Sequence, residues 1–193
     1  MKKTIIILLF TIVIISCSKE ENKTPIIYGE ENPLNGFLSQ LFYYEETYTY
    51  INELGGIAQV GMSFTPLVKG KINAIVVKIP SVNNNLKVAI WDKQTRAKLR
   101  VEYLNVTSAN SFITKEITPL ELTKDKEYVI TMFSDDYYAR NRTDNAVGEF
   151  PVISGNIKMT KSVTGEGETE LFPLSGSGNQ YFGDCSFNFQ QTE

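Results

Sequence analysis

Short runs of alternating or continuous apolar residues, separated by turn residues, fill the chain after its first 17 positions. They predict strands, because side chains with a period of two line one face of a sheet and β-branched and aromatic residues favour strands. Helical periodicity is weak throughout this region. The expected strands are Leu41–Tyr50, Gln59–Thr65, Lys71–Ile79, Leu86–Trp91, Leu99–Asn105, Phe112–Ile117, Tyr128–Phe133, Asn156–Lys161 and Gln180–Phe189. Short strands joined by tight turns predict an all-β fold, an antiparallel, jelly-roll-like β-sandwich.

The apolar run Thr4–Ile15 at the N-terminus does not belong to this pattern. It follows Lys2 and Lys3 and is too short to span a bilayer, which takes about 20 residues, so it fits the apolar region of a signal peptide. The small residue Ser16 and then Cys17 follow the run, and this arrangement resembles a bacterial lipobox. A plain signal peptide with an incidental cysteine is the alternative.

The domain organisation follows from cleavage before Cys17. Residues 1–16 would form the signal peptide, and Cys17 would carry acyl chains, several of which give stable membrane anchoring where one is marginal. Residues 17–36 are polar and contain prolines, so they predict a flexible tether. Residues 37–193 are long enough for one domain, here a single β-sandwich.

The residues directly after the cysteine bear on location. Ser18-Lys-Glu-Glu21 resembles the export signal of surface lipoproteins of the Bacteroidota. The sequence therefore predicts a lipid-anchored outer-membrane protein that faces outward from the cell.

Composition excludes several classes of function. The chain has no histidine, which removes imidazole bases and His-ligated metals, and its two cysteines cannot build a structural zinc site or a disulfide framework. Loss of the signal peptide takes away two lysines and no acidic residue, so the net charge changes from −3 to −5. This charge argues against nucleic acid as a partner. Cys185 alternates with Phe187 and Phe189, which predicts a buried, inert thiol.

Several strand motifs resemble one known family. They are Glu53–Phe64, Gly70–Lys78, Val88–Asp92, Pro119–Leu122 and Lys126–Ile130. Over roughly residues 54–189 the chain is similar to the domain of unknown function 4082 family, a β-sandwich of bacterial secreted and surface proteins that often occurs beside carbohydrate-active modules. The resemblance implies the fold and an envelope location, and that family has no established catalytic residues.

The densest polar and aromatic stretch lies after the expected strand Tyr128–Phe133 and lacks periodicity, so we expect a loop. Tyrosine rings, arginine forks and carboxylates together suit a glycan or peptide ligand. Its candidate ligand-binding residues are Asp135, Asp136, Tyr137, Tyr138, Arg140 and Arg142. Trp91, the only tryptophan, is a further candidate platform for a sugar ring. The alternatives are a solvated loop and, for Trp91, a packed strand residue.

Carboxylates could also serve a metal or a catalytic pair. Asp135, Asp136, Asp144 and Glu149 could hold Ca²⁺, although their spacing matches no EF-hand. A glycosidase needs two acids that flank a bond, and the adjacent pairs Glu45-Glu46 and Asp135-Asp136 would point to opposite faces of a strand. We therefore expect no enzymatic activity and no required cofactor.

The leading hypothesis is a non-catalytic binding domain, with a glycan as the ligand. The alternative is a structural or adhesive accessory protein that docks to another envelope protein through a sheet face. Exposed tyrosines of the aromatic strip Phe42–Tyr50 would serve that role if they point outward.

Overall fold

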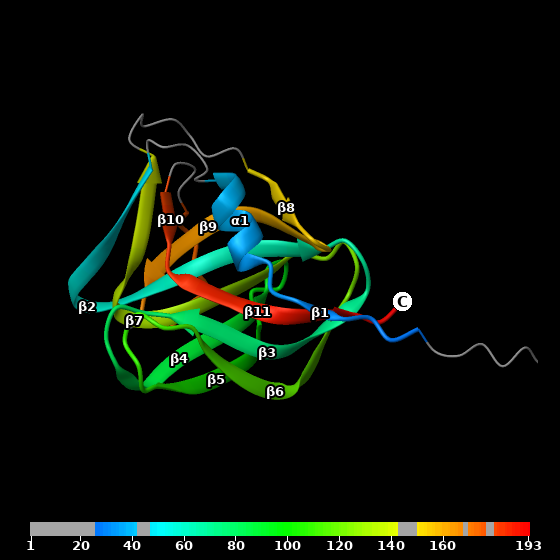
Figure 1. The fold of residues 1–193 in the computed structure, drawn as a ribbon, viewed down its shortest axis with the longest axis horizontal. Coiled ribbons are helices and arrows are strands. Elements are labelled where there is room, and N and C mark those ends of the chain that lie inside the picture. The colour runs from blue at the N-terminus through cyan, green and yellow to red at the C-terminus, as the bar shows by residue number, and fades with distance from the viewer. Residues whose placement is uncertain (1–25, 42–46, 143–149, 168–169, 177–179) are drawn as a thin grey trace, which may run out of the picture.

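A computed structural model describes residues 26–41, 47–142, 150–167, 170–176 and 180–193. Two antiparallel sheets pack face to face, which confirms the predicted all-β sandwich (Figure 1). The smaller sheet has the order β1-β11-β3-β6. Its strands are β1 (Glu30–Glu31), β11 (Asp184–Gln191), β3 (Gly70–Lys78) and β6 (Ile113–Leu122).

The larger sheet has the order β5-β4-β7-β2-β9-β8. Its strands are β5 (Lys98–Val106), β4 (Asn83–Asp92), β7 (Tyr128–Arg142), β2 (Thr47–Pro66), β9 (Ile157–Glu166) and β8 (Val152–Ser154). A short strand, β10 (Gln180–Phe182), pairs with the far end of β7, so that β7 lies between β10 and β2 at the left of Figure 1.

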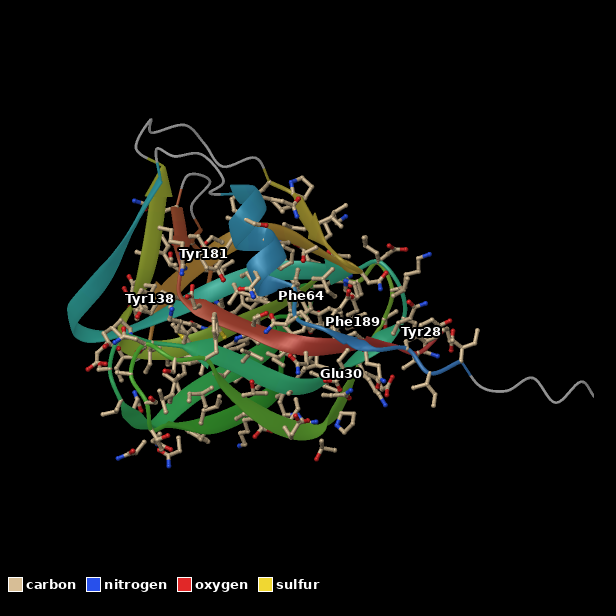
Figure 2. The ribbon with its side chains drawn as sticks, in the orientation of Figure 1. Tyr28, Glu30, Phe64, Tyr138, Tyr181 and Phe189 are labelled. Atoms are coloured by element: carbon tan, nitrogen blue, oxygen red, sulfur yellow. The ribbon has the colours of Figure 1, made fainter. Side chains whose placement is uncertain are left out.

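Alternating residues from both sheets build the main core between them. In β4, Leu86, Val88 and Ile90 are buried there, as their period of two predicts. The rings of Phe64 on β2 and Phe187 on β11 lie 4.5 Å apart and join the two sheets. Figure 2 shows Phe64 and Phe189 within this layer.

Cys185 on β11 lies in the same core, as predicted from its alternation with two phenylalanines. Burial raises the pKa of its thiol far above the ordinary value, because an apolar site disfavours the thiolate. The thiol is therefore an unreactive packing group.

The predicted tether covers residues 17–36, but the folded sandwich already begins at Glu30. Glu30 in β1 pairs with Gln190 of β11, and Leu34 and Phe37 of helix α1 (Leu34–Leu41) are buried in the main core. The tether prediction is therefore wrong from Glu30 onward. The polar residues of this segment suggested a tether, but one of them has a structural role. The carboxylate of Glu31 accepts a hydrogen bond from the backbone N–H of Asn156.

A wide bulge in β2 positions the functional site. Glu53 is the register partner of Asp136, and Ala58 is that of Ser134. Residues 54–57 of β2 therefore lie opposite the single residue Asp135. A bulge of this kind bends the strand and turns side chains outward. Ile57 and Asp135 consequently flank one end of a groove on the outer face of the larger sheet.

Candidate functional site

The outer face of the larger sheet carries a second apolar cluster, which lies away from the other sheet. Its buried residues are Ala89, Trp91, Val129, Phe133 and Val163. Phe172, which comes from a segment after β9, packs on this cluster. A sheet face that would otherwise meet water is thus partly covered by the chain itself.

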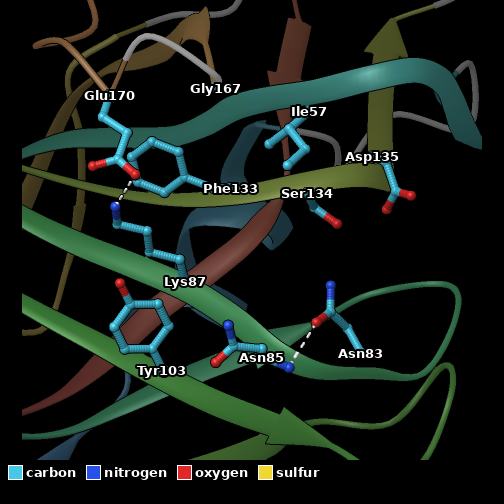
Figure 3. A pocket seen from close by; sticks show the side chains of 10 residues that line it. All are labelled: Ile57, Asn83, Asn85, Lys87, Tyr103, Phe133, Ser134, Asp135, Gly167 and Glu170. Atoms are coloured by element: carbon cyan, nitrogen blue, oxygen red, sulfur yellow. Dashed lines mark hydrogen bonds and ion pairs between the residues drawn. The ribbon is translucent and has the colours of Figure 1, made fainter.

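A groove of about 630 Å³ opens beside this cluster (Figure 3). Its floor is a row of register partners, in which Lys87 of β4 lies between Tyr103 of β5 and Phe133 of β7. The ammonium of Lys87 lies 5.1 Å from the centre of the Phe133 ring, which is cation–π distance. Tyr103 is 50% exposed, so its aromatic ring is accessible to solvent in the groove.

Polar groups line one end of the groove. The backbone N–H of Asn85 donates to Oδ1 of Asn83 at 2.9 Å, a local turn that holds this start of β4 in place. Asp135 is exposed at the bulge, next to Ser134 (Figure 3). Amide and carboxylate groups thus offer both donors and acceptors within reach of the aromatic floor.

Glu170 forms the opposite wall. Its carboxylate pairs with the ammonium of Lys87 inside the groove (Figure 3). It also pairs with the ammonium of Lys98 at 3.2 Å. The hydrogen bonds from Lys87 and then Lys98 hold the pKa of Glu170 below its ordinary value. The wall is therefore a carboxylate that stays ionised between two lysines.

The stretch predicted as a binding loop is instead the second half of β7, and this prediction is wrong. Asp136 is buried and accepts hydrogen bonds from the hydroxyls of Ser81 and Ser134. Tyr137 is buried in the main core, with its ring edge-on to Phe182 at 6.0 Å. Pairing with β2 and β10 satisfies this backbone, so polar composition does not make it a loop.

Two further candidates serve the fold at the same end. The guanidinium of Arg140 donates to both carboxylate oxygens of Asp184, one at 2.8 Å, and Asp184 is fully buried. Tyr138 donates to Oδ1 of Asn110 and is half-buried. The side chain of Arg142 lies outside the described part of the structure. Of the five predicted loop residues whose side chains the structure describes, Asp135 is the one that lines the groove.

Trp91 is covered in this structure, so it offers no open platform. Its ring and that of Phe172 form a T-shaped pair with centres 5.9 Å apart. The ammonium of Lys98 lies 5.1 Å from the centre of the Trp91 ring, and the indole N–H donates to the Thr131 hydroxyl at 3.2 Å. In this structure Trp91 is a packed strand residue, which was the alternative interpretation. Phe172 could not be anticipated as its cover, because it comes from a distant segment.

The predicted calcium ligands do not assemble among the described residues. In that part of the chain no group of three or more acidic, histidine or cysteine side chains could hold a metal ion. Asp136 is already engaged by two hydroxyls, and Asp144 and Glu149 lie outside the described residues. The side chains of the whole strip Phe42–Tyr50 likewise lie outside the described part of the structure.

Sequence reasoning missed most of the groove. Lys87 and Tyr103 occupy outward positions of two predicted strands, and Asn83 and Asn85 lie between the predicted strands Lys71–Ile79 and Leu86–Trp91. The alternation in β4 was a usable signal for Lys87. The register that sets Tyr103 beside it, and the return of Glu170, depend on pairings between segments far apart in sequence.

No protein-family model matches the sequence, and comparison with curated proteins finds no significant match. The resemblance to the domain of unknown function 4082 family therefore stays a prediction. Within the described residues, no helix is both long and apolar enough to cross a bilayer.

Proposed function

We propose that this protein is an outer-membrane lipoprotein, anchored through Cys17, whose sandwich binds a glycan without catalysis. The observation that carries the proposal is the groove itself. It combines an exposed tyrosine with amide, hydroxyl and charged groups on a rigid sheet.

The chemistry of the groove suits a sugar chain. The C–H face of a pyranose packs on an aromatic ring, and Tyr103 offers such a ring at low conformational cost. The hydroxyls of a sugar both donate and accept hydrogen bonds, which Asn85 and Asp135 can complement. The groove is open to solvent, which suits a polymer.

The proposed role is non-catalytic because the described residues of the groove include no suitable pair of acids. A glycosidase needs a carboxylic acid with a raised pKa opposite a second carboxylate. Among the described residues, the carboxylates that line the groove are Asp135 and Glu170. The pKa of Glu170 is shifted downward by its two lysines, the wrong direction for a general acid.

Replacing Tyr103 with alanine tests the proposal. In affinity electrophoresis against a panel of neutral and acidic polysaccharides, Tyr103→Ala should weaken retention at least about tenfold, or about 1.4 kcal/mol. The loss follows from removal of the stacking surface while the core stays intact.

Phe112→Ala is the matched control. Phe112 is 47% exposed, close to the 50% of Tyr103, but it lies beside Lys78 and away from the groove. Its replacement should leave retention unchanged. Equal retention of both variants and the parent chain on every polysaccharide would overturn the proposal and favour docking to an envelope protein.

A further inference from the structure

Residues 170–176, here called the strap, cross the outer face of the larger sheet. The strap touches the sheet through Glu170, which pairs with Lys87 and Lys98, and through Phe172 on Trp91. Near its far end, the carbonyl of Ser175 accepts a hydrogen bond of 3.0 Å from the backbone N–H of Thr164. The strap therefore separates Trp91 from the open groove.

The two lysines form a site for one carboxylate. Their side chains are 13% and 32% exposed, and each ammonium lies 5.1 Å from an aromatic ring, Phe133 for Lys87 and Trp91 for Lys98. The two ammonium groups can bind a carboxylate of a ligand, and the aromatic rings beside them can contact the C–H face of the sugar ring that carries it. Within the chain, Glu170 supplies that carboxylate.

Several features oppose the closed position of the strap. Glu170 has a φ of 49°, in the left-handed region that residues other than glycine seldom adopt. Leu171 and Leu174 point to water. On β2 of the larger sheet, Oε1 of Gln59 and Oγ of Ser63 are buried without a hydrogen-bond partner among the described residues. Buried polar atoms of this kind are costly to leave unpaired.

Ser63 lies next to the strap. It lines a small cavity of about 90 Å³ together with Phe172 and Pro173 of the strap. Its unpaired hydroxyl therefore borders space directly below the strap. Lifting the strap would expose this hydroxyl and the Trp91 ring on one continuous face with Tyr103.

We infer that the glycan contains hexuronate units, and that a uronate carboxylate displaces Glu170 from Lys87 and Lys98. This inference rests on the proposed function of the groove. Displacement releases the strap, and the sugar ring that carries the carboxylate stacks on Trp91. The strap thus acts as an internal competitor that mimics the ligand, and Trp91 is a covered extension of the groove.

The matched ligands are polygalacturonate and the same polymer with its carboxylates methyl-esterified. The full mature protein should bind polygalacturonate at least tenfold more tightly, because the ester keeps the sugar and removes the charge. Trp91 is the only tryptophan, so its fluorescence reports on the strap directly. Binding of polygalacturonate should change its emission.

Glu170→Gln separates competition from a purely structural wall. The variant loses the competing charge, so its affinity for polygalacturonate should rise at least threefold, whereas Lys98→Gln should lower affinity. Glu121→Gln, an exposed glutamate on β6 of the other sheet, should change neither value. A structural wall predicts instead that Glu170→Gln weakens binding or leaves it unchanged.

The outcomes distinguish this inference from the proposed function. Equal binding of the esterified and free polymers, with loss of both in Tyr103→Ala, would overturn the uronate inference and keep glycan binding. An affinity of Glu170→Gln equal to or below that of the parent chain would also overturn the inference. Failure to bind any polysaccharide would overturn both.

Discussion

Replacing Asp184 with alanine is expected to lower the free energy of unfolding by about 3–5 kcal/mol. Asp184 is fully buried, and both of its carboxylate oxygens accept hydrogen bonds from the guanidinium of Arg140. That guanidinium lies 5.9 Å from the ring centres of Tyr138 and Tyr181. Removal of the carboxylate would leave the largely buried guanidinium of Arg140 without its ion-pair partner, a severe loss. Urea denaturation followed by circular dichroism measures it.

A surface ion pair provides the control. Lys69 and Glu193 also form a pair, but their side chains are 52% and 67% exposed. Glu193→Gln should therefore change the free energy of unfolding by only about 0–1 kcal/mol. An Asp184→Ala variant as stable as Glu193→Gln would contradict the structural role given to Arg140 and restore it as a candidate ligand contact.

Replacing Cys17 with alanine should abolish incorporation of a fatty-acid analogue and release the protein from the membrane fraction. The expected loss is complete, because the sequence offers one lipobox-like site and stable anchoring needs several acyl chains on it. Metabolic labelling followed by gel fluorescence gives the readout.

The second cysteine of the chain is the matched control for the anchor. Cys185 is buried in the main core, and its raised thiol pKa makes it unreactive. Cys185→Ala should therefore keep the full label. Label that persists in Cys17→Ala would show that the apolar run Thr4–Ile15 does not precede a lipidation site.

Much of the fold could be predicted because local sequence patterns mark the residues that form the core. The alternation of Leu86, Val88 and Ile90 sets the inner face of β4, and the β-branched run in Lys71–Ile79 gives the central strand β3. Helix α1 was missed although its start carries a signal. Pro33 precedes it, and Oδ1 of Asn32 accepts a hydrogen bond from the N–H of Leu34.

The candidate site was harder to predict because tertiary contacts decide which polar groups stay exposed. Asp136 and Asp135 are identical neighbours in the sequence, yet one is buried against two hydroxyls and the other lines the groove. The bulge in β2 opposite them makes this difference. Likewise, Trp91 is concealed by Phe172, which lies about 80 positions further along the chain. No local pattern encodes either relation.

The most direct test of glycan binding in the groove is a map of backbone amide shifts. An isotope-labelled protein is titrated with an oligosaccharide of a polymer that it retains, and nuclear magnetic resonance spectra are followed. We predict the largest shift changes at Asn85, Lys87, Tyr103 and Asp135, which line the groove. Changes centred on β3 or β6 of the smaller sheet would contradict the account.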